Sequence, residues 1–200
     1  MRLLIPMALS LLLLGGAVPL SGCGDSDCAR KGDAGVPIGG AFELTDQAGK
    51  AVTDETLKGK YRIVYFGFTY CPDICPTELQ NISGALDALG PDAAKFTPVF
   101  ITIDPERDTA DVMGKYLTSF HPSFIGLTGT AEQVARAAGA YRVFYSKEVP
   151  PDAPDAYTMN HSGYVYLMDC QGRYIRHFDA GTSGADIARA LKDLLDPDRT

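Results

Sequence analysis

The sequence contains no cluster of lysine or arginine, and its formal net charge is -7 over 200 residues. Nucleic acids and anionic membrane surfaces are therefore poor partners, because both attract basic patches. The sequence also has no internal repeat, which excludes a repeat architecture. Its cysteines form no two closely spaced pairs of the kind that supply the four protein ligands of a structural zinc site, so such a site is not expected. A positively charged ligand such as a single metal ion remains compatible with this composition.

The overall composition is that of an ordinary globular protein, with 46% hydrophobic and 22% charged residues. Its length suits one domain with a short leader. A domain of this size buries most of the surface that its unfolded chain exposes, so it needs no disulfide framework. We therefore interpret the five cysteines first for their chemistry.

Residues 1–22 have the layout of a secretory signal, with Arg2 ahead of an apolar run from Leu3 to Leu14. Residues 20–22, directly before Cys23, resemble a bacterial lipobox. Cleavage there makes Cys23 a lipid-modified N-terminus; the alternative is an uncleaved anchor, since ~20 uncharged residues can span a bilayer. We favour the lipoprotein. Both alternatives place the domain outside the cytoplasm, in the periplasm and tethered to the bacterial membrane, where disulfides are permitted.

Residues 23–40 are rich in glycine, aspartate and alanine, and we predict that they form a flexible tether. The folded domain is then expected at residues 41–196. We expect Cys28 to be an incidental cysteine of the tether. We expect Cys170, in a hairpin turn, to be a solvent-facing or partly buried thiol with no part in metal binding.

Short apolar runs alternate with amphipathic patterns along the domain. Strands are predicted at residues 61–68, 96–103, 143–146, 164–168 and 174–178. Helices are predicted at residues 76–89, 109–120, 130–141 and 183–195. The first has an apolar face formed by Leu79, Ile82, Leu86 and Leu89. The third begins with a capping box of Thr130 and Gln133. Strands that alternate with helices and end in a hairpin indicate an α/β domain with a mixed central sheet.

The segment at residues 69–76 joins the strongest predicted strand to the best predicted helix. It delivers Cys71 to the start of the helix, where unpaired N–H groups and the helix dipole favour a thiolate. In a helical turn, Cys71 and Cys75 share one face at a Cα separation of about 6 Å. The pair can close into a disulfide or hold a soft metal, either Cu(I) or zinc. A purely structural disulfide over so small a loop stabilises little.

Residues 68–76 resemble the signature of the Sco/SenC family, and residues 101–109 resemble its second motif. Asn160, His161 and Ser162 lie where the third motif is expected, and residues 124–129 also fit. The resemblance extends from Val36 to the C-terminus. It implies a thioredoxin-like fold of the peroxiredoxin branch. It also implies copper, as Cu(I), Cu(II) or both, bound by Cys71, Cys75 and His161.

The activity that this resemblance implies is assembly of the binuclear copper centre in subunit II of cytochrome c oxidase. Copper delivery, thiol reduction or both can serve that end. The expected partner is this subunit or another apo copper protein, and the chain is expected to be monomeric. In the alternative function, Cys71 and Cys75 form the redox-active pair of a thiol–disulfide oxidoreductase. A peroxidase is a weaker alternative, because no arginine or histidine flanks Cys71.

His161 follows Cys71 by ninety residues, so the sequence alone does not bring the two together. A lone histidine near a strand start is more often structural, and it is the resemblance that makes His161 a ligand. The family usually has an acidic residue at the preceding position, where this chain has Asn160. This difference removes a negative charge but no ligand. We expect Met159 to fill the core.

The other candidates outside the cysteine motif have structural interpretations. His121 and His177 are expected to be structural. Asp104 and Asp108 follow the second predicted strand. They either form an acidic loop beside the copper site, or Asp108 caps the next helix beside a local ion pair.

Overall fold

The computed structural model describes residues 28, 32–33, 35–153 and 156–196. The predicted signal segment at residues 1–22 and the predicted lipidation site Cys23 lie outside these residues. Within the described ranges, no helix is both long enough and apolar enough to cross a membrane.

The centre of the fold is a seven-stranded sheet in the order β2-β1-β5-β4-β3-β8-β9. Its strands are β1 (Glu43–Asp46), β2 (Ala51–Thr53), β3 (Tyr61–Gly67), β4 (Phe96–Thr102), β5 (Ile125–Thr128), β8 (Val165–Met168) and β9 (Tyr174–Phe178). Strands β3, β4 and β5 are parallel, whereas β1, β2, β8 and β9 add antiparallel pairs. The predicted mixed sheet of an α/β domain is therefore confirmed.

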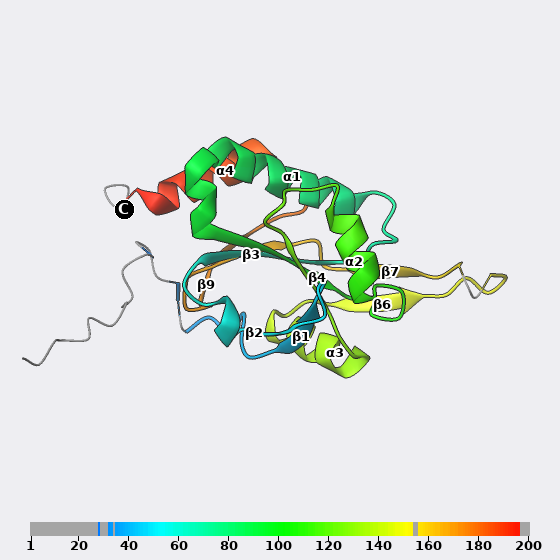
Figure 1. The fold of residues 1–200 in the computed structure, drawn as a ribbon. Coiled ribbons are helices and arrows are strands. Elements are labelled where there is room, and N and C mark those ends of the chain that lie inside the picture. Colours follow the sequence, from blue (N-terminus) through cyan, green and yellow to red (C-terminus); the bar gives the residue numbers. More distant parts are fainter. Residues whose placement is uncertain (1–27, 29–31, 34, 154–155, 197–200) are drawn as a thin grey trace, which may run out of the picture.

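Helices cover both faces of this sheet (Figure 1). They are α1 (Ile74–Leu89), α2 (Ala110–Leu117), α3 (Ala131–Ala140) and α4 (Gly184–Leu195), with short 3-10 helices η1 (Glu55–Leu57) and η2 (Gly90–Lys95). Helices α1 and α4 pack side by side on one face, and α3 lies on the other. The predicted capping box of α3 is present, with reciprocal hydrogen bonds between Thr130 and Gln133.

Strand β3 runs through the middle of the core, and all seven of its residues are buried. Helix α1 follows it and buries its predicted apolar face, formed by Leu79, Ile82, Leu86 and Leu89. The helix begins at Ile74, two residues earlier than predicted. Cys71 therefore lies in the loop ahead of the helix, so the expectation that both cysteines belong to one helical turn was wrong.

Two further strands, β6 (Tyr145–Glu148) and β7 (Thr158–His161), form an antiparallel ribbon separate from the main sheet. In Figure 1 this ribbon extends from one side of the molecule. The sequence patterns did not predict β1, β2, β5 or β7. Three of these strands have exposed and half-buried positions without a clear apolar alternation, so their pairing depends on tertiary context.

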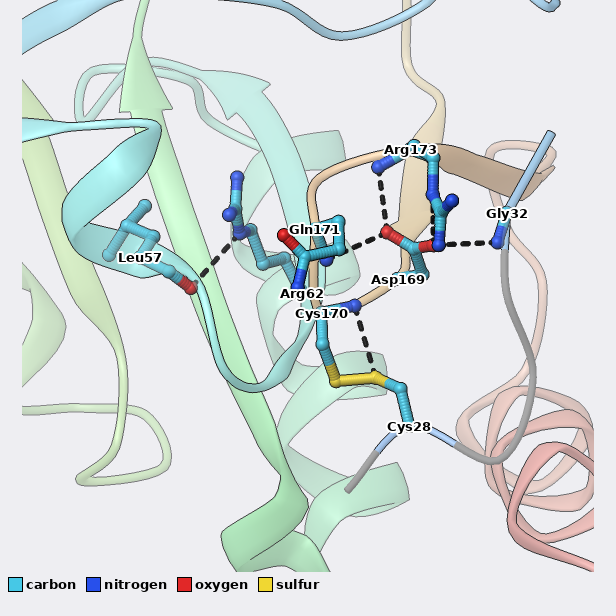
Figure 2. Close-up of a disulfide and its surroundings, with 8 residues drawn as sticks. All are labelled: Cys28, Gly32, Leu57, Arg62, Asp169, Cys170, Gln171 and Arg173. Atoms are coloured by element: carbon cyan, nitrogen blue, oxygen red, sulfur yellow. Dashed lines mark hydrogen bonds and ion pairs between the residues drawn. A yellow bond between two sulfur atoms is a disulfide. The ribbon is translucent and has the colours of Figure 1, made fainter. Parts of the chain in front are cut away.

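Cys28 and Cys170 form a disulfide across 142 positions of sequence (Figure 2). Their Cα atoms are 5.9 Å apart, inside the range that a disulfide bridges. The expectations that Cys28 is incidental and that Cys170 is a free thiol were therefore wrong. No local pattern links positions so distant in the chain, because only the tertiary fold brings them together.

The described residues near Cys28 pack on the domain. The backbone N–H of Gly32 donates a 2.7 Å hydrogen bond to the carboxylate of Asp169, which Figure 2 also shows. Asp33 forms an isolated antiparallel bridge with Tyr174. Cys28, Gly32 and Asp33, which belong to the predicted tether, are thus bonded to the turn between β8 and β9 and to the first residue of β9.

We predict that Cys28→Ser lowers the free energy of unfolding of the oxidised protein by about 2–4 kcal/mol, because the disulfide restricts a very long loop of the unfolded chain. Urea unfolding followed by circular dichroism measures this change. The same substitution in a Cys71→Ala/Cys75→Ala background serves as the control, since it excludes any contribution from the other cysteine pair. An unchanged unfolding midpoint in both backgrounds would contradict the prediction.

Candidate metal centre

Three residues from separate parts of the chain meet at one edge of the fold. Cys71 lies in the loop after β3, Cys75 in the first turn of α1, and His161 at the end of β7. One potential ligand atom from each lies within 4.8 Å of the others. The predicted approach of His161 to the two cysteines is therefore confirmed. No other group of this kind occurs in the parts of the chain that the structure describes.

The loop between β3 and α1 aims the Cys71 sulfur at the helix. The N–H of Cys71 donates to the carbonyl of Phe68 at 3.2 Å, which turns the chain. The sulfur of Cys71 then accepts the backbone N–H of Cys75 at 3.4 Å. The first N–H groups of a helix have no partner within the helix, so this contact satisfies one of them and stabilises a thiolate at Cys71.

A buried carboxylate holds this loop in place. Asp108 accepts the backbone N–H of Thr69 at 3.0 Å and its hydroxyl at 2.5 Å. It also accepts the Thr102 hydroxyl at the end of β4, at 2.6 Å. Burial raises the pKa of Asp108, although these hydrogen bonds oppose the change. The loop that carries Cys71 is thereby bonded to the neighbouring strand.

The structure supports part of each interpretation of Asp104 and Asp108. Both carboxylates are buried, and Asp108 is bonded to the loop that carries Cys71, so the acidic residues lie beside the centre with their oxygens engaged within the fold. The expected local ion pair exists, between Asp104 and Arg107. The expected cap does not: Thr109, whose hydroxyl accepts the N–H of Val112, caps α2. Asp108 was unavailable for capping because its oxygens bind Thr69 and Thr102.

The ring of His161 is oriented by one backbone contact and two aromatic neighbours. Its Nδ1 lies 3.0 Å from the carbonyl oxygen of Ser162. A carbonyl only accepts, so Nδ1 carries the proton and Nε2 presents its lone pair. Nε2 lies 3.5 Å from the sulfur of Cys75. The rings of Tyr65 and Phe68 pack edge-on against the imidazole. This is the tautomer that a metal-binding histidine needs.

The two sulfurs have opposite electrostatic environments. A hydrogen bond from the Cys75 thiol, together with the backbone N–H groups of Asp73 and Cys75, lowers the pKa of Cys71 well below its usual range, despite burial. The neighbouring Cys71 sulfur and burial raise the pKa of Cys75. Burial also raises the pKa of Tyr65, whose hydroxyl stays protonated and donates to the Cys75 sulfur at 3.7 Å. In the reduced, metal-free protein, Cys71 is therefore the thiolate and Cys75 the thiol.

The other candidates lie outside this centre. His121 contacts Ser123 through Nδ1 at 2.7 Å, and His177 contacts the Tyr174 hydroxyl at 2.6 Å. Met159 is half-buried against the hydrophobic core, as expected. Asn160 is exposed on the ribbon.

Sequence analysis missed Gly67, the last residue of β3. A Cβ at this position would lie 2.8 Å from the Cys75 sulfur and 3.0 Å from the rings of Phe100 and Tyr65. Only glycine leaves room for the sulfur there. The available signal was a glycine in a buried strand pattern, which often marks the close approach of another group.

Comparison with known proteins agrees with this geometry. The sequence model of the SCO1/SenC family matches residues 30–196. A SCO2-like protein of Rickettsia felis is 44% identical over 157 residues, which cover 78% of this chain and 77% of the relative.

Two solved structures are similar over most of the chain. Bradyrhizobium japonicum ScoI, solved with copper bound, is 48% identical with a TM-score of 0.73 and matches 79% of this chain and 99% of that one. Copper-bound yeast Sco1 is 37% identical with a TM-score of 0.71, over 78% and 88% of the respective chains.

The fold and the centre define a thioredoxin-like protein with a Cys-Cys-His group able to hold a metal ion. Within that class, the chain belongs to the SCO1/SenC family.

We predict that Cys71 of the reduced, metal-free protein reacts with iodoacetamide at neutral and mildly acidic pH. Because its pKa is lowered, the thiolate persists below the ordinary cysteine pKa of about 8.5 and is lost only as the pH falls through the lowered value. Mass spectrometry of alkylated peptides between pH 4 and 10 measures this dependence. The Cys71→Ala variant is the control for reaction at Cys75. A rate at Cys71 that rises only between pH 8 and 9 would contradict the prediction.

We also predict that Gly67→Ala lowers the free energy of unfolding by about 1–3 kcal/mol, because the new methyl group overlaps the Cys75 sulfur and strand β3 is paired on both sides. Gly84→Ala is the matched control. Its added Cβ meets nothing within 4 Å and lies in α1, where alanine favours the helix. Urea unfolding distinguishes the two variants, and equal midpoints would refute the proposed overlap.

Proposed function

We propose that this protein is a copper metallochaperone that binds copper through Cys71, Cys75 and His161 and gives it up to an apo copper protein. The observation that carries the proposal is the meeting of two sulfurs and an imidazole nitrogen within 4.8 Å. The nitrogen presents a lone pair toward the sulfurs, and one sulfur is already a thiolate.

The donor set fits copper. Thiolates are soft ligands that suit Cu(I), and imidazole suits copper as well. A structural zinc site normally has four protein ligands, and the described residues offer three at this position. Two relatives that cover most of this chain were solved with copper bound. Copper, as Cu(I), Cu(II) or both, is here the cargo.

The location of the centre supports transfer by ligand exchange. Cys71 keeps 9% of its surface exposed, while Cys75 is fully buried. His161 is half-buried at the end of the ribbon. An incoming thiolate of an acceptor can therefore approach the copper from the side of Cys71 and His161. We propose that the acceptor is the binuclear copper site of subunit II of cytochrome c oxidase, or a similar apo copper protein.

The proposed location is the periplasmic side of a bacterial membrane, with Cys23 carrying the lipid. Cys23 precedes the disulfide-bonded Cys28 by five positions. Such an anchor confines the domain near a membrane-embedded acceptor and raises the effective concentration of the copper donor. We propose that the protein acts there as a monomer.

The asymmetry between the sulfurs favours a second function, reduction of the acceptor's cysteines. The Cys71 thiolate attacks an acceptor disulfide, forming a mixed disulfide and releasing one acceptor thiolate. Cys75 then loses its proton and attacks the Cys71 sulfur. The second acceptor thiolate leaves, and a Cys71–Cys75 disulfide remains. Two electrons pass from this pair to the acceptor, and His161 is not consumed in either step.

Anaerobic Cu(I) titration against a chromogenic chelator tests copper binding. We predict that the wild type binds one Cu(I), that Cys71→Ala/Cys75→Ala abolishes binding at this site, and that His161→Ala weakens it at least tenfold because one of three ligands is lost. Equal affinity for the wild type and the double cysteine variant would overturn copper binding at this site.

A second assay separates delivery from reduction. The reduced protein is mixed with an oxidised peptide carrying two acceptor cysteines, and the free thiols of the peptide are counted. If the protein is a reductant, His161→Ala retains most of the activity. If only copper transfer operates, the peptide stays oxidised with every variant.

A further inference from the structure

The ribbon that carries His161 has no strand pairing with the main sheet in the described part of the fold. It consists of β6 and β7 alone. A two-stranded ribbon is marginally stable by itself in water. The position of His161 relative to the sulfurs therefore depends on side-chain contacts that fasten the ribbon to the rest of the domain.

Arg107 supplies the most extensive of these contacts. Its Nε donates to the Asp104 carboxylate at 2.5 Å, and its Nη1 donates to the Tyr157 carbonyl at 3.0 Å. Its Cζ lies 3.7 Å from the centre of the Tyr157 ring, 4.6 Å from that of Tyr70 and 5.9 Å from that of Phe68. One guanidinium thus touches the loop after β4, the loop that carries Cys71, and the residue that enters β7.

Tyr157 is the ribbon's side of this junction. It directly precedes β7, four residues before His161. Its hydroxyl donates to Asp104 at 2.8 Å, so Asp104 binds both Arg107 and Tyr157. From the other strand of the ribbon, Lys147 lies 3.8 Å from the centre of the same ring and pairs with Glu106 at 2.7 Å.

The contacts differ in how strongly they hold the ribbon, because they differ in burial. The Lys147–Glu106 pair is largely exposed, and such pairs contribute little. The Asp104 side chain is 3% exposed and that of Arg107 is 19% exposed, so losing one partner leaves a buried charge uncompensated. Arg107 also lies over Phe68, whose ring packs edge-on against His161. The guanidinium therefore reaches the imidazole through the ribbon and through this ring.

We propose that Arg107 is a positioning residue that clamps the β6–β7 ribbon against the cysteine loop and so keeps His161 within reach of Cys71 and Cys75. The clamp consists of Arg107, Asp104 and Tyr157. This proposal rests on the proposed copper site, but it concerns a separate question, namely what holds His161 in place.

The direction in which copper affinity changes when Arg107 is removed distinguishes a positioning role from a purely electrostatic one. A positive charge near a cation site weakens cation binding, so its removal alone strengthens the binding of copper. Loss of positioning has the opposite sign, because the imidazole then spends less time near the sulfurs. Loss of residues that orient metal ligands typically costs 10–100-fold in affinity.

Cu(I) affinity in a double-mutant design tests the clamp. We expect Arg107→Ala to weaken binding about 10–100-fold in the wild type. In a His161→Ala background, we expect no further loss, because Arg107 acts through His161. Arg189→Ala is the matched control, since it removes another arginine paired with an aspartate three positions away, on the exposed face of α4. Unchanged or stronger binding by Arg107→Ala, or the same loss in both backgrounds, would overturn the proposal.

A measurement without copper keeps the clamp distinguishable from the copper proposal. Amide hydrogen exchange of the metal-free protein should be faster in β6 and β7 of Arg107→Ala, with β8 unchanged. Tyr157→Phe removes only the hydroxyl bond to Asp104, and we expect a smaller change in the same direction. This variant and its exchange pattern decide the question if Arg107→Ala does not fold. Unchanged ribbon exchange in the folded variant would refute the clamp, whereas failure of the wild type to bind copper would refute only the proposed function.

Discussion

The centre depends on one long-range contact, the 3.5 Å approach of His161 Nε2 to the Cys75 sulfur across 86 positions of sequence. Cys75 is fixed from the other side, because its buried sulfur occupies the space that the missing side chain of Gly67 leaves beside Tyr65. The sulfur is therefore a rigid reference point in the core. His161 belongs to a ribbon outside the main sheet, so it has to be brought to that point. Because the sulfur and the imidazole are held by separate parts of the chain, the surrounding hydrogen bonds have to join those parts. They connect the loop that carries Cys71, the loop after β4 and the ribbon that carries His161.

These hydrogen bonds form two groups, one around Asp108 and one around Asp104 and Arg107. Asp108 bonds the loop that carries Cys71 to the end of β4 through Thr69 and Thr102. Just ahead of Asp108 in the chain, Asp104 and Arg107 bond the ribbon to the same loop. Residues 104–108 therefore act on both sides of the centre, and a single loop sets the distance between the sulfurs and the imidazole. Buried carboxylates are suited to this task because each accepts several hydrogen bonds at once and is costly to leave unpaired.

The sequence predicted the parts of this architecture that depend on local patterns. The apolar runs of β3 and β4, the amphipathic face of α1 and the capping box at Thr130 are periodic or adjacent signals, and the structure confirms them. The resemblance to a known family supplied His161. Local patterns could not find the Cys28–Cys170 disulfide or the contact between Thr69 and Asp108, because each joins positions that only the folded sheet brings together. Asp108 illustrates the failure well: its place before a helix indicated a cap, but tertiary hydrogen bonds engaged its oxygens and left that role to Thr109.

Strand β3 connects the two sites that carry cysteine chemistry. At its first residues it pairs with Met168 beside the turn that holds Cys170, and at its last residue it abuts the Cys75 sulfur. Seven strand residues span about 20 Å, so the disulfide and the metal centre occupy opposite ends of the same strand. Cys28 is consequently joined to the domain at the end of β3 remote from Cys71 and His161. If the proposed lipid anchor at Cys23 is correct, it is linked to the domain through Cys28 and Cys170, and the length of β3 separates that link from the metal centre, so Cys71 and His161 stay accessible to an acceptor.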